Sequence, residues 1–314
     1  MAHQSSLSPD LLSKNLCKLP TPHGEKLFRL LKNSKLPASD HQRIESAIQK
    51  YQYWLQQLKT LPFEEQFDIK QAVDLLNEYR FFLDIQVIFD SPNDFLYRQK
   101  GQLKLESSVI EEFLPHLVAH KFPSLCKTSE IGPAPTFLGL YFEGGSPYYP
   151  TKVRLKEKDQ DFAVYKRVQI VVTALSNKKL GTHSTNIAYL CAECKTNLDK
   201  TMFQEAASTA SEVKRALPTA KYLLISEWLD MTPISTAGLP IDEVLILRKA
   251  RRLNAELRKH FGTSEGRKTY RDMYVRYLKN NPFYPDVFQR FLWHIQLVIQ
   301  DKSLTKDVLI KGYF

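Results

Sequence analysis

Two stretches rich in β-branched and aromatic residues, separated by a polar segment, constrain the fold of this chain more than any other feature. Residues 161–173 (DFAVYKRVQIVVT) and 187–195 (IAYLCAECK) have the composition and length of β-strands. Residues 176–186 (SNKKLGTHSTN), which lie between them, are polar and contain a glycine, as is typical of a turn. The sequence therefore predicts an antiparallel hairpin over residues 161–195.

The open end of this hairpin gathers groups that can bind a cation beside a water molecule. Side chains alternate between the two faces of a strand, so Glu193 and Lys195 project from one face, roughly 7 Å apart. A hairpin with its midpoint near residue 177 sets Asp161 opposite Cys194, between those two side chains. Carboxylates bind hard cations, and a neighbouring ammonium group can polarise a water molecule.

This arrangement resembles the catalytic motif of the PD-(D/E)XK nuclease superfamily, in which an Asp opens one strand and an acid-x-Lys closes the next. The resemblance implies that Asp161 and Glu193 bind Mg²⁺ and that Lys195 positions or activates the attacking water. The Pro-Asp dipeptide of the family is Gln160-Asp161 here, so Asp159, two residues earlier on the same face, is an alternative to Asp161. The first helix of the superfamily core commonly lends an acid to the metal, which implies Glu112 as a further ligand.

Two longer segments resemble the Bpu-type restriction endonucleases. These are residues 94–115 (DFLYRQKGQLKLESSVIEEFLP) and 192–206 (AECKTNLDKTMFQEA), and a fainter likeness over residues 23–54 extends the resemblance to most of residues 22–228. The resemblance implies a type II enzyme that cuts an asymmetric site in double-stranded DNA. It also implies a second, related nuclease subunit, with a homodimer as the alternative.

The order of the expected elements predicts an α/β fold with a mixed sheet, and the resemblance implies that this sheet is a restriction-endonuclease-like core flanked by helices. A small-residue helix from Asp199 or Thr201 to about Leu217 joins the hairpin to a buried strand at 222–228 (YLLISEW), which requires a parallel crossover. Helical periodicity over 44–58 and 67–82 indicates a mainly helical N-terminal subdomain, residues 1–90. Residues 91–314 then form the nuclease core with basic C-terminal helices.

Several local patterns give further expectations. Residues 129–150 are dense in Gly, Pro and aromatics, so we expect an irregular segment, and Ser108-x-x-Glu111 fits a capping box at the start of a helix. Asp242 is expected to open a helix to Lys259. Other patterns make Glu227 a residue at the rim of the sheet and predict a final apolar helix over 286–300.

A net charge of +10 favours a polyanionic partner such as DNA. One basic group is a turn around Gly101, with either phosphate contact or a solvated loop as its role. A second group occupies the face of the expected 242–259 helix opposite its apolar residues, and there we expect contact with the DNA backbone. The candidate DNA-binding residues are Arg98, Lys100, Arg248, Arg251 and Arg252.

Other classes of protein are disfavoured. No run of about 18 apolar residues is present, as a membrane helix would require, and the N-terminus lacks a secretory pattern, so we expect a cytoplasmic protein. The four cysteines form no framework, because the CxxC pair Cys191 and Cys194 is divided between the two faces of a strand; free thiols are expected. A DNA-binding subunit that does not cut, and a repair nuclease specific for structures, remain the alternative functions.

Overall fold

The fold is organised around one mixed sheet of five strands in the order β1-β2-β3-β4-β5. The computed structural model describes residues 19–144, 148, 151–175 and 179–300. β2 is antiparallel to both of its neighbours, β1 and β3, whereas β4 runs parallel to β3 and β5 parallel to β4. The strands are β1 (Glu130–Glu143), β2 (Lys152–Thr173), β3 (Lys179–Leu198), β4 (Lys221–Leu229) and β5 (Glu243–Ile246).

Helices precede, interrupt and follow the strands. Those before the sheet are α2 (Pro22–Leu31), α3 (Ala38–Lys59), α4 (Ile69–Phe81), α5 (Phe95–Gln99) and α6 (Ser107–Lys121), with the short 3-10 turns η1 (Glu64–Gln66) and η3 (Leu125–Lys127) and the π-helical turn η2 (Phe82–Phe89). The helix α7 (Lys200–Ala216) joins β3 to β4. After β5 come α8 (Ala255–His260), α9 (Ser264–Thr269), α10 (Arg271–Asn280) and α11 (Pro285–Gln300).

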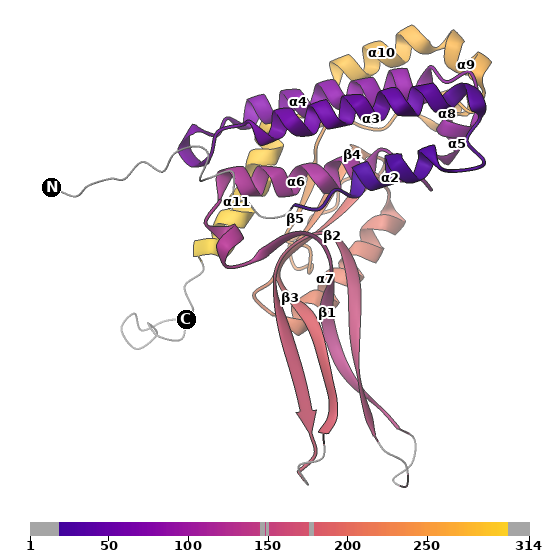
Figure 1. Cartoon of the computed structure of the whole chain (residues 1–314). Coiled ribbons are helices and arrows are strands. Elements are labelled where there is room, and N and C mark those ends of the chain that lie inside the picture. Colours follow the sequence, from indigo (N-terminus) through magenta and orange to yellow (C-terminus); the bar gives the residue numbers. More distant parts are fainter. Residues whose placement is uncertain (1–18, 145–147, 149–150, 176–178, 301–314) are drawn as a thin grey trace, which may run out of the picture.

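Two hydrophobic clusters place helices on both faces of the sheet. The larger one joins α2, α3, α4, α6 and α11 to residues such as Phe162, Leu190 and Leu223 of the sheet, and the smaller one packs α7 on the other face through Ala206 and Ala210. Figure 1 shows the long helices α3 and α4 above α2 and α6, with the strands beneath them. A subdomain boundary at residue 90 remains a proposal, and it would divide the larger cluster.

The 22-residue strand β2 serves two hairpins at once. Its first part pairs with β1 and its last part with β3, and only Ala163, Val164 and Tyr165 pair with both. β2 arches below the helices, so that both hairpins point away from them (Figure 1). The two ribbons bond to each other, because Thr185 Oγ1 donates to Glu157 Oε1 (2.5 Å) and Asn186 Nδ2 donates to the Pro135 carbonyl (2.7 Å).

The expected mixed α/β core is confirmed, together with the hairpin, the helix after β3, the strand over 222–228 and the last helix. Asp199 caps α7, since its carboxylate accepts a hydrogen bond from the Met202 amide (2.8 Å). The parallel pairing of β3 with β4 confirms the crossover. Within the described residues, the structure contains no helix with the length and apolarity needed to span a lipid bilayer.

Three local expectations were wrong. Residues 130–143 form β1, because cross-strand pairing with β2 accommodates Gly132 and Gly139 at two irregularities in the register. The expected capping box is absent, because the Ser108 hydroxyl donates to the Lys104 carbonyl (2.5 Å). Glu227 is not at the rim; it is 1% exposed.

The helix expected from Asp242 to Lys259 is also absent. Pairing with β4 makes residues 243–246 an edge strand, and the chain becomes helical only at α8. Asp242 does not cap a helix, since its carboxylate accepts hydrogen bonds from the Tyr222 amide (2.7 Å) and Lys221 Nζ (3.1 Å). Tertiary pairing therefore overrides an apolar spacing that resembles a helical one.

Candidate active site

A cavity of about 890 Å³ lies where the turn between α5 and α6, the middle of β2 and the end of β3 meet the C-terminal helices. Asp161, Glu193 and Lys195 all line it, and aromatic side chains including Tyr97, Trp228 and Tyr274 also contribute to its wall. The three residues singled out from the sequence therefore share one cavity.

Asp161 is fixed to the strand that carries the other two residues. Its Oδ2 accepts a hydrogen bond from the Cys194 amide (2.9 Å), between Glu193 and Lys195 in the chain. β2 has a bulge at this point. The flanking pairs are Gly132 with Ala163 and Ala134 with Gln160. Two residues of β2, Asp161 and Phe162, therefore lie opposite the single residue Pro133 of β1. A bulge of this kind redirects a side chain, which explains how the carboxylate reaches β3.

The register of the hairpin differs by one residue from the expected one. Phe162 pairs with Ala192, which sets Asp161 across from Glu193, because irregularities beside Thr173 and Tyr165 shift the pairing. The irregularity at Tyr165 also places Ala188 in the hydrophobic cluster under α7, with Cys191. From Leu190 to Cys194 the predicted alternation holds, since Leu190, Ala192 and Cys194 all join the larger cluster.

Glu193 is held by two partners. Tyr222 of β4 donates a hydrogen bond to its Oε2 (3.0 Å), and Lys195 Nζ lies 2.6 Å from its Oε1. Burial, with the neighbouring Glu193 carboxylate, raises the pKa of the Tyr222 phenol, so this group donates as a neutral hydroxyl. Tyr222 was not among the site residues expected from the sequence, where its only signal is its position at the start of the buried strand.

Asp159, the alternative first acid, also lines the cavity. Its side chain is exposed, and among the described residues no ion pair or hydrogen bond is found that fixes it. Asp161 is more enclosed, with its side chain 20% exposed, and is anchored to β3. The geometry therefore favours Asp161 over Asp159.

Glu112 is not brought to this group, contrary to the expectation. It is fully buried beneath α2, where its carboxylate accepts hydrogen bonds from Tyr51 Oη (2.7 Å), the His23 amide (2.9 Å) and the Gly24 amide (3.3 Å). Burial raises the pKa of Glu112 to about 7. This carboxylate anchors the first turn of α2 and is committed to that structural role.

The acid of α6 that is linked to Asp161, through a shared lysine, is the preceding residue, Glu111. Its Oε1 lies 3.8 Å from Lys104 Nζ, and the same ammonium lies 3.6 Å from Asp161 Oδ1. A second lysine, Lys26 of α2, approaches Glu111 Oε2 at 3.2 Å. From the sequence, Glu111 stands out only as part of a capping box, and Lys104 belongs to the basic turn around Gly101.

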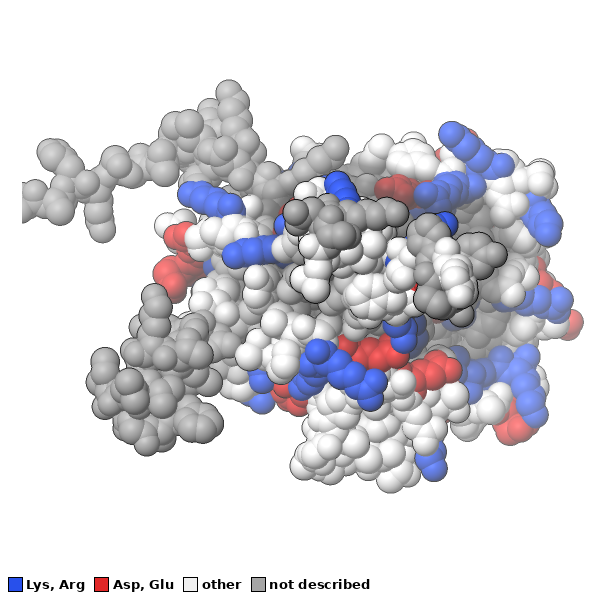
Figure 2. Space-filling view, turned by 90° about the horizontal axis from the view of Figure 1, so that it is seen from below, with Lys and Arg blue, Asp and Glu red and all other residues white. Residues whose placement is uncertain are grey.

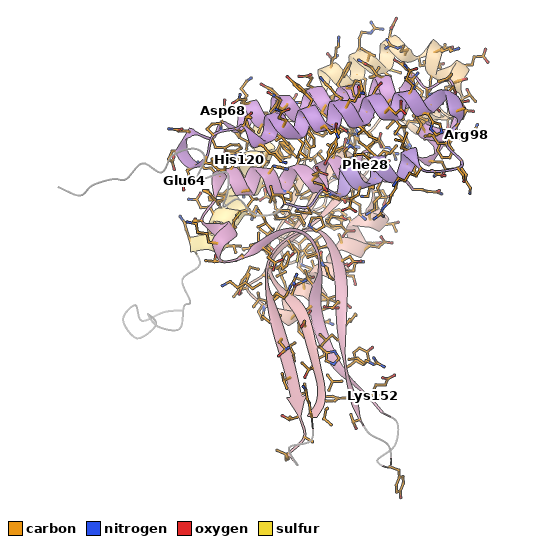
Figure 3. The ribbon with its side chains drawn as sticks, in the orientation of Figure 1. Phe28, Glu64, Asp68, Arg98, His120 and Lys152 are labelled. Atoms are coloured by element: carbon orange, nitrogen blue, oxygen red, sulfur yellow. The ribbon has the colours of Figure 1, made fainter. Side chains whose placement is uncertain are left out.

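The candidate DNA-binding residues occupy different environments. Arg251 is exposed, and Arg98 projects at the end of the helical layer near α5, with its side chain 59% exposed (Figure 3). Arg252 Nη1 pairs with Asp230 Oδ2 (3.1 Å), and Lys100 Nζ pairs with Glu106 Oε1 (2.8 Å). Arg98, Lys100 and Arg252 line the cavity.

Arg248 was expected to contact DNA, but the structure buries it. It is 4% exposed, and its guanidinium lies 3.8 Å from the centre of the Phe283 ring and 3.3 Å from Glu227 Oε2. Glu227 also binds Arg80 Nη1 at 2.8 Å, and Asp84 lies 3.1 Å from Arg80 Nη2. Arg248 therefore belongs to a buried network of two arginines and two acids and does not face DNA.

Among the described residues, the cysteines belong to no group of three or more potential metal ligands. Cys191 and Cys194 are free and buried, in the two different hydrophobic clusters, as the alternation predicts. The expectation of free thiols is wrong for Cys126, which is disulfide-bonded; Cys17 lies outside the described residues.

Asp161 and Glu193 are suitable ligands for a Mg²⁺ ion that also keeps some of its bound waters. No group of three or more His, Cys, Asp and Glu side chains within the described ranges is arranged to hold a metal by itself. Mg²⁺, however, is commonly held by one or two carboxylates together with waters and substrate phosphates. Asp161 and Glu193 provide such a pair, with hard oxygen donors next to an open cavity.

A mixed sheet with helices on both faces, together with an acid on β2 beside an acid-x-Lys on β3, defines a restriction-endonuclease-like α/β protein. The same fold occurs in a solved structure described as the native BbvCI A2B2 tetramer at low resolution, with a TM-score of 0.50, 17% identity, and coverage of 81% of this chain and 96% of that chain. The chain belongs to the Bpu10I restriction endonuclease family, whose model matches residues 102–314. No curated protein matches the sequence.

Family membership makes this chain a nuclease of the restriction-endonuclease type. The match covers the turn with Lys104, helix α6, all five strands and the C-terminal helices. Helices α2 to α5 lie before it.

Proposed function

We propose that this chain is a Mg²⁺-dependent subunit of a type II restriction endonuclease that hydrolyses phosphodiester bonds at a specific sequence in double-stranded DNA. The observation that carries the proposal is the hydrogen bond from the Cys194 amide to Asp161 (2.9 Å), with Glu193 and Lys195 on either side of Cys194. These groups line one cavity of about 890 Å³. Family membership supports the type of reaction.

The residues have distinct roles in this proposal. Asp161 and Glu193 hold Mg²⁺, which when bound supplies charge neutralisation at the phosphate and a more acidic water. Lys195 Nζ lies 2.6 Å from Glu193 Oε1, and when the metal takes this carboxylate the ammonium turns to the attacking water or to the phosphate, to which it donates a hydrogen bond. Tyr222 keeps Glu193 oriented toward the cavity through its hydrogen bond.

A second subunit completes the proposed enzyme. The similar solved structure is described as an A2B2 tetramer, which supports a pair of unlike subunits over a homodimer. One chain with one catalytic group accounts for hydrolysis of one strand of the duplex. A related partner subunit would then cut the other strand.

A cleavage assay on undamaged plasmid tests the proposal. We expect the chain, assembled with its partner subunit, to cut at a fixed sequence in Mg²⁺ and to lose all cleavage in excess EDTA, with recovery when Mg²⁺ is restored. Fragment ends mapped on a denaturing gel give the positions cut. Metal-independent DNA binding without cleavage would instead indicate a specificity subunit, and cleavage confined to branched or damaged DNA would indicate a repair nuclease.

Arg98, Lys100, Arg251 and Arg252 are the proposed contacts to the DNA backbone. Three of them line the cavity, and Arg251 is exposed next to Arg252. Seen from below, basic and acidic side chains are interspersed and form no continuous basic face (Figure 2). The surface charge on that side therefore indicates no DNA-binding face, and the proposed contacts are the basic residues at and beside the cavity.

Replacing Arg251 by Ala is expected to weaken binding to any duplex, whatever its sequence. Loss of one phosphate contact should lower the slope of log K against log salt concentration by about 1. Fluorescence anisotropy of a labelled duplex at several salt concentrations measures both quantities. Lys70→Ala is the matched control, because Lys70 lies close to Asp68 at the opposite end of the helical layer from Arg98 (Figure 3). An equal response of the two variants would contradict the assignment.

A further inference from the structure

Lys104 is a charged residue at the active site to which the catalytic motif assigns no role. It lies in the turn between α5 and α6, lines the cavity, and has a side chain that is 53% exposed. Its ammonium lies 3.6 Å from Asp161 Oδ1 and 3.8 Å from Glu111 Oε1. It thus stands between two carboxylates that come from different elements, β2 and α6.

The backbone of Lys104 adopts a conformation that lysine rarely takes. Its φ is +49°, in the left-handed region that costs a residue with a Cβ free energy. Such conformations persist where the surrounding structure determines them, and they cluster at functional sites. The Lys104 amide donates to the Gly101 carbonyl (3.1 Å), which closes the turn.

A chain of buried hydrogen bonds holds this turn from the N-terminal helices. The Ser108 hydroxyl donates to the Lys104 carbonyl (2.5 Å), so its oxygen is left to accept from His23 Nδ1 (2.9 Å). His23 Nε2 then accepts from the Tyr79 hydroxyl (2.6 Å). This assignment requires a neutral imidazole, and burial lowers the pKa of His23 to about 3. The position of Lys104 is therefore built into the fold from α2 and α4.

We propose that the Lys104 ammonium occupies the position of the cation in the metal-free protein, neutralises Asp161 and Glu111, and must swing away when a divalent ion binds. The proposal rests on the proposed function, because it takes Asp161 as a metal ligand. Two positive charges cannot share one carboxylate at this distance without repulsion. Lysine has a flexible four-carbon stem, and the half-exposed side chain has room to move into the cavity.

The displaced Lys104 ammonium can bind DNA in the cavity. Once it leaves Asp161, Lys104 can contact a phosphate of the bound DNA strand, which lowers the cost of its displacement. By linkage, DNA then raises the affinity of the protein for the metal by the same factor as the metal raises the affinity for DNA. Lys104 is thus a positioning residue that couples the two binding events.

Calorimetric titration of the full chain with Mn²⁺, without DNA, tests the proposal independently of cleavage. Removing the competing ammonium in Lys104→Met should lower the Kd for Mn²⁺ on the order of fivefold to tenfold, as expected for loss of two partly exposed ion pairs. Lys104→Gly, which also relaxes the left-handed backbone, should act in the same direction. Lys158→Met removes the same charge from the cavity lining, away from the Lys104 ion pairs, and should change the Kd less than about twofold.

The outcomes separate this proposal from the proposed function. If wild-type protein binds Mn²⁺ and Asp161→Asn abolishes binding, but neither Lys104 variant binds more tightly, the role of Lys104 is wrong and the nuclease proposal stands. If Asp161→Asn binds Mn²⁺ as wild type does, the metal-binding role of Asp161 is wrong, and the role of Lys104 falls with it.

Discussion

Replacing Lys195 by Ala, or Glu193 by Gln, should abolish cleavage of one DNA strand while leaving DNA binding intact. Glu193→Gln keeps the size of the side chain and an oxygen that can accept from Tyr222, so it removes the negative charge with little else. Lys195→Ala removes the ammonium 2.6 Å from Glu193. Loss of one group that stabilises charge at a reacting centre costs roughly a hundredfold to a thousandfold in rate.

The experiment is a nicking assay on supercoiled plasmid with the variant assembled with its wild-type partner. The expected product is an open circle cut in one strand, because the partner still hydrolyses the other strand. Gel-shift measurements on the same samples should give unchanged affinity. Lys179→Ala is the control: Lys179 begins β3, at the far end of the strand from the cavity. If either variant formed linear plasmid at the wild-type rate, Glu193 and Lys195 would not be the active site.

Replacing Glu227 by Ala should cause the largest loss of stability of any change considered for this chain. Glu227 is 1% exposed and neutralises both Arg80, at 2.8 Å, and Arg248, at 3.3 Å. Its removal leaves Asp84 as the acid close to both guanidinium groups. Breaking a buried ion pair by deleting one partner typically costs about 3–5 kcal/mol, because the remaining charge stays buried.

Urea denaturation of the variant, followed by circular dichroism, measures this loss. Asp74→Ala is a matched control on the same helix as Arg80, since it removes an ion pair that lies at the surface, with Lys70 at 2.7 Å. Exposed pairs contribute little to stability, so the midpoint of this control should barely move. A Glu227→Ala variant as stable as Asp74→Ala would show that the network does not depend on this carboxylate.

The hairpin could be predicted from the sequence because its signals are local. Alternation along a strand has a period of two residues, and this places Glu193 and Lys195 on one face whatever the rest of the chain does. The turn residues and the β-branched stretches likewise act over a few neighbours. The resemblance to the Bpu-type enzymes added the family, which the match over residues 102–314 confirms.

The choice between neighbouring residues depended on packing. Glu111 and Glu112 are successive on α6, so they point in directions about 100° apart. Rotation of α6 against α2 turned Glu112 to the amides of His23 and Gly24 and left Glu111 toward Lys104. Helical periodicity gives the relative directions of two side chains, but the contacts between helices decide which one is turned toward Lys104.

The same distinction holds for the basic residues and the sheet. The sequence by itself determined the composition of the β2–β3 hairpin, the placement of Glu193 and Lys195 on one face of β3, and the order of hairpin, α7 and β4. Only the tertiary structure decided that β2 bulges at Asp161, that residues 243–246 add to the sheet edge and that Arg248 is buried. The physical reason is that hydrogen bonding between strands and burial of charge involve residues far apart in the chain, and no local pattern records their partners.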